Sequence, residues 1–123
     1  MCNLDAVSCK IKEVANKYGI DYKLAIAISR WETGNYTSYA FINRNNVGGL
    51  MFWNGTRSEL QTFNSLDAGI EAFITLLKYN YIDLGLDTIE EIQKKYAPVG
   101  VANDPNNLNS NWVRGVTNLY NQL

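Results

Sequence analysis

Apolar residues recur at helical spacing along most of this chain, and residues that begin or end helices separate the stretches. The first stretch carries Val7, Ile11 and Val14 and reaches Gly19, which can stop a helix, while Asp21 can begin the next. Residues three, four and seven positions apart share one face of a helix, so each stretch can bury that face. The chain is therefore expected to build its core mainly from packed helices.

Three further helices are expected in the second half of the chain. Ser65 can cap the first of them and Gly85 can end it. The sequence TIEE at 88–91 has the form of a capping box and opens a short helix that stops before Pro98. The expected inward residues are Leu66, Ile70, Phe73, Ile74, Leu77 and Tyr81, and, in the last helix, Trp112, Val116, Leu119, Tyr120 and Leu123.

The segment 35–64 has a different character, because it is rich in Asn, Gly, Tyr and Thr. Its Asn54-Gly55 pair lies between strand-favouring residues, which is a signal for a β-hairpin. The expected fold class is therefore α+β and mostly helical, with a small hairpin lobe facing a helical lobe across a cleft. With 123 residues the chain suits one domain, 1–123.

The composition excludes several kinds of chemistry. The chain has no histidine, which removes Ser-His-Asp machinery and histidine-containing zinc sites, so no metal and no cofactor are expected. Its net charge of −1 gives no basic surface for nucleic acid. No run approaches the roughly 18 apolar residues of a membrane span, so no membrane insertion is expected. An enzyme of this composition would use carboxylates, tyrosines, amides and backbone groups.

The two cysteines, Cys2 and Cys9, are too few for a four-thiolate metal site. On one continuous helix they would lie about 10 Å apart, which is too far for a disulfide. They are therefore expected to be two separate thiols near the terminus.

Glu32 continues an apolar stripe, since it follows Leu24 and Ile28 at intervals of four residues. Burial beside Trp31 would raise the pKa of its carboxyl. Gly34 marks the end of the helix, where the negative end of the helix dipole acts in the same direction. A carboxyl that keeps its proton near neutral pH suits a general acid.

An alternative interpretation of Glu32 stays open at this point. A glutamate at the end of a helix can also turn to solvent or pair with Arg30 or Arg44. Periodicity alone does not separate this surface role from the catalytic one.

The residues after the helix could line a sugar-binding cleft. Asn45 and Asn46 carry amides, and a ligand can approach the main chain closely at Gly48 and Gly49. Tyrosine and tryptophan rings can stack on sugars. Equally, Asn and Gly are common turn residues, and aromatic residues often belong to the core.

The segment AIAISRWETGNYTSYAFINRNNVGGLMF, at 25–52, resembles the signature of lysozyme-like peptidoglycan glycosidases. Within that group the chain resembles most closely the glucosaminidase-type cell-wall hydrolases of Gram-positive bacteria and their phages. The segments FNSLDAGIEAFITLLKYNYIDLGLDTIEEIQKKYAPVG and NDPNNLNSNWVRGVTNLYNQL extend the resemblance to about residues 10–123.

The resemblance implies a lysozyme-like fold and cleavage of β-1,4 bonds between GlcNAc and MurNAc in peptidoglycan. Glu32 falls on the catalytic acid of the family, and Tyr96 on a tyrosine that faces the cleaved sugar. The segment opposite the acid maps onto Asn46, Gly48, Gly49 and Met51. The resemblance also implies a monomer that acts outside the cell or in the cell wall, alone, within a larger secreted protein or on a phage virion.

A second carboxylate is harder to assign. Glu59 lies in the expected hairpin, where some glucosaminidases carry a second acid, but its polar neighbours also suit a solvated charge. Asp67 resembles a helix-start residue, and Asp104 lies in a turn-forming segment. Without a second carboxylate, the N-acetyl group or the 6-hydroxyl of the substrate could act as the nucleophile.

Two alternatives to a hydrolase remain. A lytic transglycosylase would leave anhydro-MurNAc ends, although such enzymes usually carry glutamine where this chain has Phe52. A non-catalytic module with a lysozyme-like shape could bind the cell wall or serve as a structural part.

Overall fold

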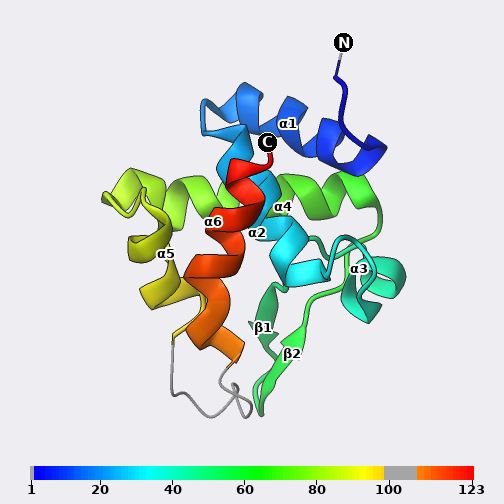
Figure 1. Ribbon diagram of the computed structural model, residues 1–123. Helices are drawn as coiled ribbons and strands as arrows, with labels where there is room; N and C mark the ends of the chain where they lie inside the picture. Colours follow the sequence, from blue (N-terminus) through cyan, green and yellow to red (C-terminus); the bar gives the residue numbers. More distant parts are fainter. Residues whose placement is uncertain (1, 99–107) are drawn as a thin grey trace.

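The computed structural model describes residues 2–98 and 108–123, and helices make up most of this part of the chain (Figure 1). Two short strands form an antiparallel sheet, so the expected α+β, mostly helical architecture is confirmed. In chain order the elements are α1 (Ala6–Tyr18), α2 (Tyr22–Thr33), α3 (Tyr39–Arg44), β1 (Met51–Trp53), β2 (Ser58–Leu60), α4 (Leu66–Asn80), the 3-10 turn η1 (Ile82–Leu84), α5 (Ile89–Tyr96), η2 (Leu108–Asn111) and α6 (Trp112–Asn121).

Several helices begin or end where local chemistry predicts. The side chain of Asp21 accepts a hydrogen bond from the backbone of Lys23 at the start of α2. Gly34 ends that helix in the left-handed conformation, with φ of 56°. Thr88 and Glu91 form the predicted capping box at the start of α5.

Two details of the helices differ from the sequence-based expectation. Helix α3 lies inside the segment 35–64, begins at the N-cap Ser38, and has no buried residue that would have produced an apolar period. Helix α4 ends at Asn80, because Tyr81 leaves the helical conformation with φ of −130°. Gly85 therefore ends the short turn η1 and not α4.

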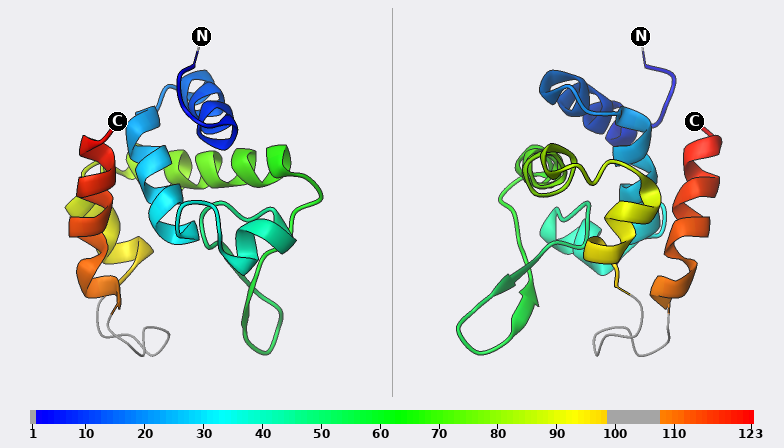
Figure 2. Two further views of the ribbon diagram at one scale, coloured as in Figure 1. Left: turned by 45° about the vertical axis from the view of Figure 1, so that its right-hand side comes forward. Right: turned by 90° about the vertical axis from the view of Figure 1, so that its left-hand side faces the viewer.

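Helix α2 is the centre of the core. It packs against α1 and α6, and α4 lies on a further side of it (Figure 2). Residues 25–28 of α2 are completely buried, which shows that the helix is enclosed on all sides at this level. The last turn of α2, which carries Glu32, is therefore held on a rigid support.

The hairpin projects from the helical body, opposite the lower ends of α5 and α6 (Figure 2). Met51 pairs with Leu60, Phe52 with Glu59 and Trp53 with Ser58. In the turn, the side-chain oxygen of Asn54 accepts hydrogen bonds from the backbone of Thr56 and Arg57. The predicted hairpin at Asn54-Gly55 is thus confirmed.

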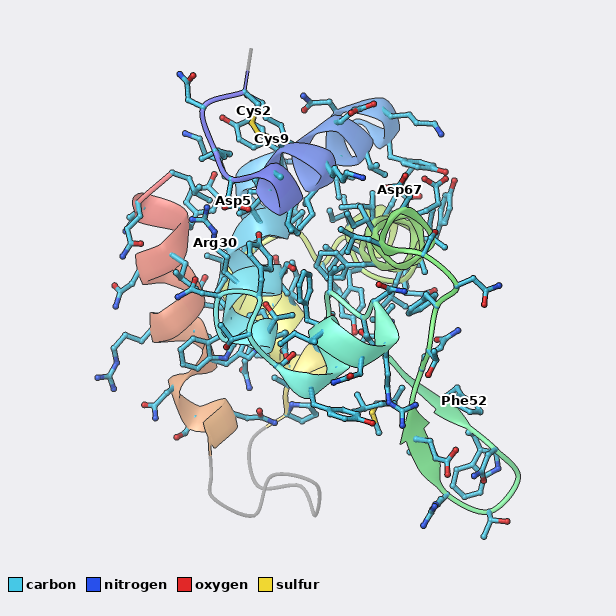
Figure 3. All side chains as sticks on the ribbon, turned by 90° about the vertical axis from the view of Figure 1, so that its right-hand side faces the viewer. Cys2, Asp5, Cys9, Arg30, Phe52 and Asp67 are labelled. Carbon is cyan, nitrogen blue, oxygen red and sulfur yellow. A yellow bond between two sulfur atoms is a disulfide. The ribbon has the colours of Figure 1, made fainter. Side chains whose placement is uncertain are left out.

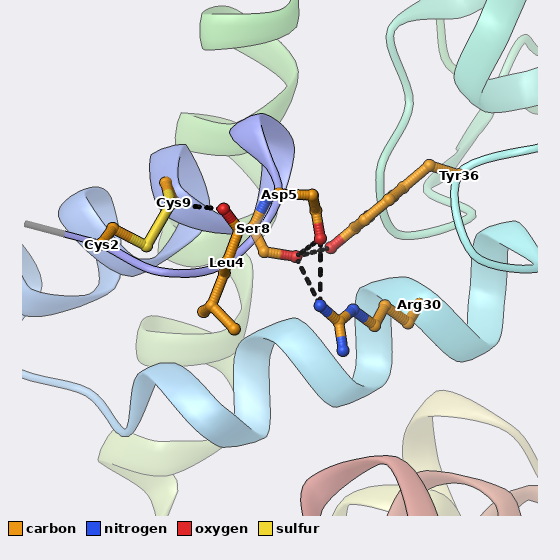
Figure 4. The surroundings of a disulfide bond; sticks show 7 residues. All are labelled: Cys2, Leu4, Asp5, Ser8, Cys9, Arg30 and Tyr36. Carbon is orange, nitrogen blue, oxygen red and sulfur yellow. Dashed lines mark hydrogen bonds and ion pairs between the residues drawn. A yellow bond between two sulfur atoms is a disulfide. The ribbon is translucent and has the colours of Figure 1, made fainter. Parts of the chain in front are cut away.

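The expectation of two separate thiols is wrong, because Cys2 and Cys9 form a disulfide (Figure 4). Helix α1 begins only at Ala6, so Cys2 lies in an extended segment that folds back along the first turns of the helix. This brings the two Cα atoms to 5.8 Å, within the range of a disulfide. The distance of about 10 Å assumed that both residues were on one helix.

Within residues 2–98 and 108–123, no helix combines the length and the apolar content needed to cross a membrane.

Replacing both cysteines, Cys2→Ser with Cys9→Ser, should lower the free energy of unfolding by about 2 kcal/mol, because a short cross-linked loop restricts the unfolded chain. Urea unfolding followed by circular dichroism measures this change. Reduction of the wild-type protein with dithiothreitol should cause the same loss. A loss in the variant without a loss on reduction would contradict the role of the cross-link.

Candidate active site

Glu32 lies in the last turn of α2 with its carboxyl largely buried. The indole Nε1 of Trp112, at the start of α6, donates a hydrogen bond of 2.9 Å to Oε1 of Glu32. This contact joins residues that are 80 positions apart in the chain. It fixes one carboxylate oxygen and leaves Oε2 to face another part of the site.

Arg30 and Arg44, the two arginines considered as partners of Glu32, form their interactions with other residues. Arg30 forms an ion pair of 3.0 Å with Asp5 and also donates to Ser8 (Figures 3 and 4). Arg44 donates to the hydroxyl of Thr62 at 2.8 Å. The alternative reading, a helix-end glutamate paired with Arg30 or Arg44, is therefore not what the fold contains.

The buried environment raises the pKa of Glu32 from 4.5 to about 6. Desolvation of the charged form is the main cause, and the hydrogen bond from Trp112 acts in the opposite direction. The indole beside the carboxyl is that of Trp112 and not that of Trp31, which packs instead against Gly115 of α6. The raised pKa expected from the sequence thus comes from burial, and the indole that contacts the carboxyl is a different one from the indole expected.

The main chain at Gly49 approaches the second oxygen of Glu32. A Cβ atom at Gly49 would lie 3.2 Å from Oε2, and its φ of 66° also favours glycine. The neighbouring Gly48 is packed more tightly, since a Cβ there would lie 2.4 Å from the ring of Phe73. Both glycines are needed for the loop to pass this close to the acid.

Asn46 holds the same loop from inside. Its side chain is completely buried, and its amide donates 2.9 Å hydrogen bonds to the carbonyls of Leu50 and Gln61. Its carbonyl oxygen accepts from the backbone of Gly48 and Leu50. The amide that was predicted to bind substrate is thus engaged within the protein.

Tyr96 supports the loop from the opposite side. Its hydroxyl donates to the carbonyl of Gly48, and its ring lies 5.6 Å from that of Tyr81 and 6.0 Å from that of Trp112. Burial, together with the nearby charge of Glu32, raises the pKa of Tyr96 well above its ordinary value, so the hydroxyl stays protonated. Tyr96 is half-buried and also lines the hollow described next.

A hollow of about 160 Å³ lies beside the acid, because Gly49 both borders it and contacts Glu32. Its lining residues are Gly49, Leu50, Met51, Leu76, Tyr81 and Tyr96. The hydroxyl of Tyr81 has no hydrogen-bond partner among the described residues. The hollow therefore combines a tyrosine hydroxyl with an apolar wall, and the carboxyl of Glu32 lies behind its edge at Gly49.

Glu59 is not part of this cluster. Directly paired residues of an antiparallel sheet share a face, so Glu59 lies on the same face as Phe52, whereas Met51 is on the other. The carboxylate of Glu59 pairs with Arg57 at 3.0 Å. It borders a separate hollow of about 320 Å³ that also includes Arg44.

The other two acidic residues considered from the sequence have separate positions. Asp67 lies in the first turn of α4 and forms an ion pair of 2.9 Å with Lys10. Asp104 lies outside the described residues. Within those residues no group of three or more His, Cys, Asp or Glu side chains could hold a metal ion.

The sequence did not assign Trp112 or Tyr81 to the site. Both were expected in the core because of their helical spacing, and both are indeed buried. Their polar atoms reach the site only because α4, α6 and the end of α2 converge, and no local pattern indicates that convergence.

Glu32→Gln should change how the free energy of unfolding depends on pH. Glutamine keeps the acceptor for Trp112 but does not titrate. Because the native pKa is about 6 and the reference value 4.5, the unfolded state releases its proton first, so the wild type loses stability as pH rises through this window. The free energy of unfolding of the variant minus that of the wild type should grow by about 2 kcal/mol between pH 4 and pH 8. A constant difference in urea unfolding would contradict a raised pKa.

Asn46→Ala should lower the free energy of unfolding by about 3 kcal/mol, because it leaves several buried backbone groups without partners. Thermal and urea unfolding measure this change. Asn43→Ala is the matched control, since Asn43 is exposed on α3, and it should change stability by less than about 0.5 kcal/mol. Equal stability of the two variants would mean that Asn46 does not support the loop.

A comparison with models of known protein families gives a match over most of the chain. The sequence model of the glucosaminidase family, described as mannosyl-glycoprotein endo-beta-N-acetylglucosaminidase, matches residues 9–123. A comparison with curated proteins finds no significant match. The resemblance noted in the sequence is thereby confirmed over almost the whole chain, and the protein belongs to the glucosaminidase family of glycoside hydrolases.

Proposed function

We propose that this protein hydrolyses the β-1,4 bond between GlcNAc and MurNAc in peptidoglycan, with Glu32 as general acid and base. The family supports a peptidoglycan glycosidase, and the family name supports cleavage on the GlcNAc side. The observation that carries the proposal is the buried carboxyl of Glu32, which has a pKa of about 6 and one oxygen directed toward Gly49 at the edge of the hollow.

In the first step, Glu32 donates its proton to the oxygen that leaves the cleaved sugar. Hydrogen bonding from Trp112 to Oε1 keeps the carboxyl oriented, so Oε2 is the oxygen that carries the proton. The resulting carboxylate then takes a proton from the water that completes hydrolysis. A pKa of about 6 suits both roles near neutral pH.

We propose further that the N-acetyl group of the substrate supplies the nucleophile. Among the described residues that line the hollow there is no second carboxylate, and Glu59 is on the other face of the hairpin. The acetamido oxygen would attack the anomeric carbon as the bond to the leaving oxygen breaks. The hydroxyl of Tyr81 offers an acceptor for the acetamido N–H, while Tyr96 positions Gly48 and Gly49.

The disulfide supports a location outside the cytoplasm, since such bonds persist in oxidising compartments. We propose a protein that acts as a monomer in the cell wall or the extracellular space, within a larger secreted protein or on a phage virion.

Glu32→Gln should abolish the loss of turbidity of cell-wall suspensions while leaving binding to insoluble peptidoglycan intact, because only the proton donor is removed. Glu59→Gln makes the same chemical change on the hairpin and separates the two mechanisms. We expect it to keep activity within about threefold of the wild type, since substrate assistance needs no second carboxylate. Loss of activity in Glu59→Gln would instead assign the second acid to the hairpin.

The products identify the bond. Mass spectrometry of borohydride-reduced digests should show reduced GlcNAc at the new ends. Reduced MurNAc would indicate a muramidase, and anhydro-MurNAc a lytic transglycosylase. Binding without release of soluble sugar would indicate a non-catalytic wall-binding module. A mannosylated glycoprotein, the substrate class in the family description, should be assayed in parallel.

A further inference from the structure

Strand β1 exposes three large apolar side chains in a row. Met51 is 50% exposed, Phe52 42% and Trp53 66%. Exposure of a single apolar residue is ordinary, but three consecutive large ones on a projecting hairpin call for an explanation.

The alternation of the strand divides these side chains between two faces. Met51 and Trp53 share one face, because side chains two positions apart point the same way. Phe52 is on the opposite face with Glu59, and in Figure 3 it lies far from α6. Since Met51 borders the hollow beside Glu32, Trp53 lies on the catalytic side of the hairpin.

Distance also favours a link between Trp53 and the hollow. Two residues along a strand correspond to about 6.6 Å, which is comparable to the length of one pyranose ring. Trp53 thus extends the surface that starts at Gly49 and Met51 by roughly one sugar, toward the tip of the hairpin. An indole face is flat and apolar, as is the C–H face of a pyranose, and stacking suits both.

We propose that Trp53 is a platform on which a sugar of the glycan strand stacks, outside the scissile bond. This assignment rests on the proposed glycosidase function. It makes Trp53 a residue that selects for chain length: a long glycan reaches it, whereas a short oligosaccharide that fills only the hollow does not. The occupant is a glycan because the face is continuous with the hollow that borders the acid.

The test compares Trp53→Ala with Phe52→Ala on two substrates. The two residues are neighbours on one strand and both are exposed, but they are on opposite faces, so Phe52→Ala is a matched control. With long soluble glycan strands, Trp53→Ala should lower kcat/KM about tenfold through KM, as expected for one lost stacking contact. With a disaccharide, which spans only the scissile bond, the loss should stay below about twofold, and Trp53→Tyr should restore most of the activity on long strands.

Three results would overturn the proposal. The first is an equal loss of kcat/KM in Trp53→Ala and Phe52→Ala. The second is a loss of kcat/KM in Trp53→Ala that is equal on long and short substrates. The third is an unchanged kcat/KM of Trp53→Ala on both substrates. Circular dichroism and urea unfolding of each variant show whether the fold is retained.

A binding measurement keeps this inference separate from the proposed function. In the Glu32→Gln background, calorimetry with long glycan strands should show about tenfold weaker binding for Trp53→Ala and unchanged binding for Phe52→Ala. Absence of cleavage by the wild type would refute the hydrolase. Equal binding of the two variants would refute the platform, whatever the outcome for cleavage.

Discussion

The hydrogen bond from Trp112 to Glu32 is the contact on which the site depends. It joins the end of the central helix α2 to the beginning of α6, 80 positions later in the chain. The same indole packs beside the ring of Tyr96, and its hydrogen bond orients the acid and partly offsets the rise in pKa that burial causes. Displacement of α6 would therefore change the geometry and the protonation of Glu32 together.

The loop at residues 46–50 is the second constraint. The fully buried side chain of Asn46 forms hydrogen bonds with it from inside, and the hydroxyl of Tyr96 donates a hydrogen bond to Gly48 from the other side. Because direct hydrogen bonds within the protein hold the loop, Gly49 can lie near the carboxyl without a side chain between them. The structure thus separates residues that shape the site, such as Asn46, from residues that border its open surface, such as Met51.

Local signals predicted much of the fold, but they missed helix α3 and the disulfide. The caps at Asp21 and Thr88, the stop at Gly34 and the Asn54-Gly55 turn depend on neighbours within a few residues, so sequence was sufficient. Helix α3 was missed because it buries no apolar face. The disulfide was missed because the prediction placed Cys2 on the helix that in fact begins at Ala6.

The sequence by itself determined that any catalysis proceeds without histidine, that Glu32 ends an apolar stripe, and that two glycines follow where a ligand can approach the main chain. Only the tertiary structure decided that Trp112 and not Trp31 faces the acid, and that Glu59 is on the far face of the hairpin. The physical reason is that periodicity assigns a residue to a face of its own element. Which face meets which is decided by the packing of elements that are distant in the chain.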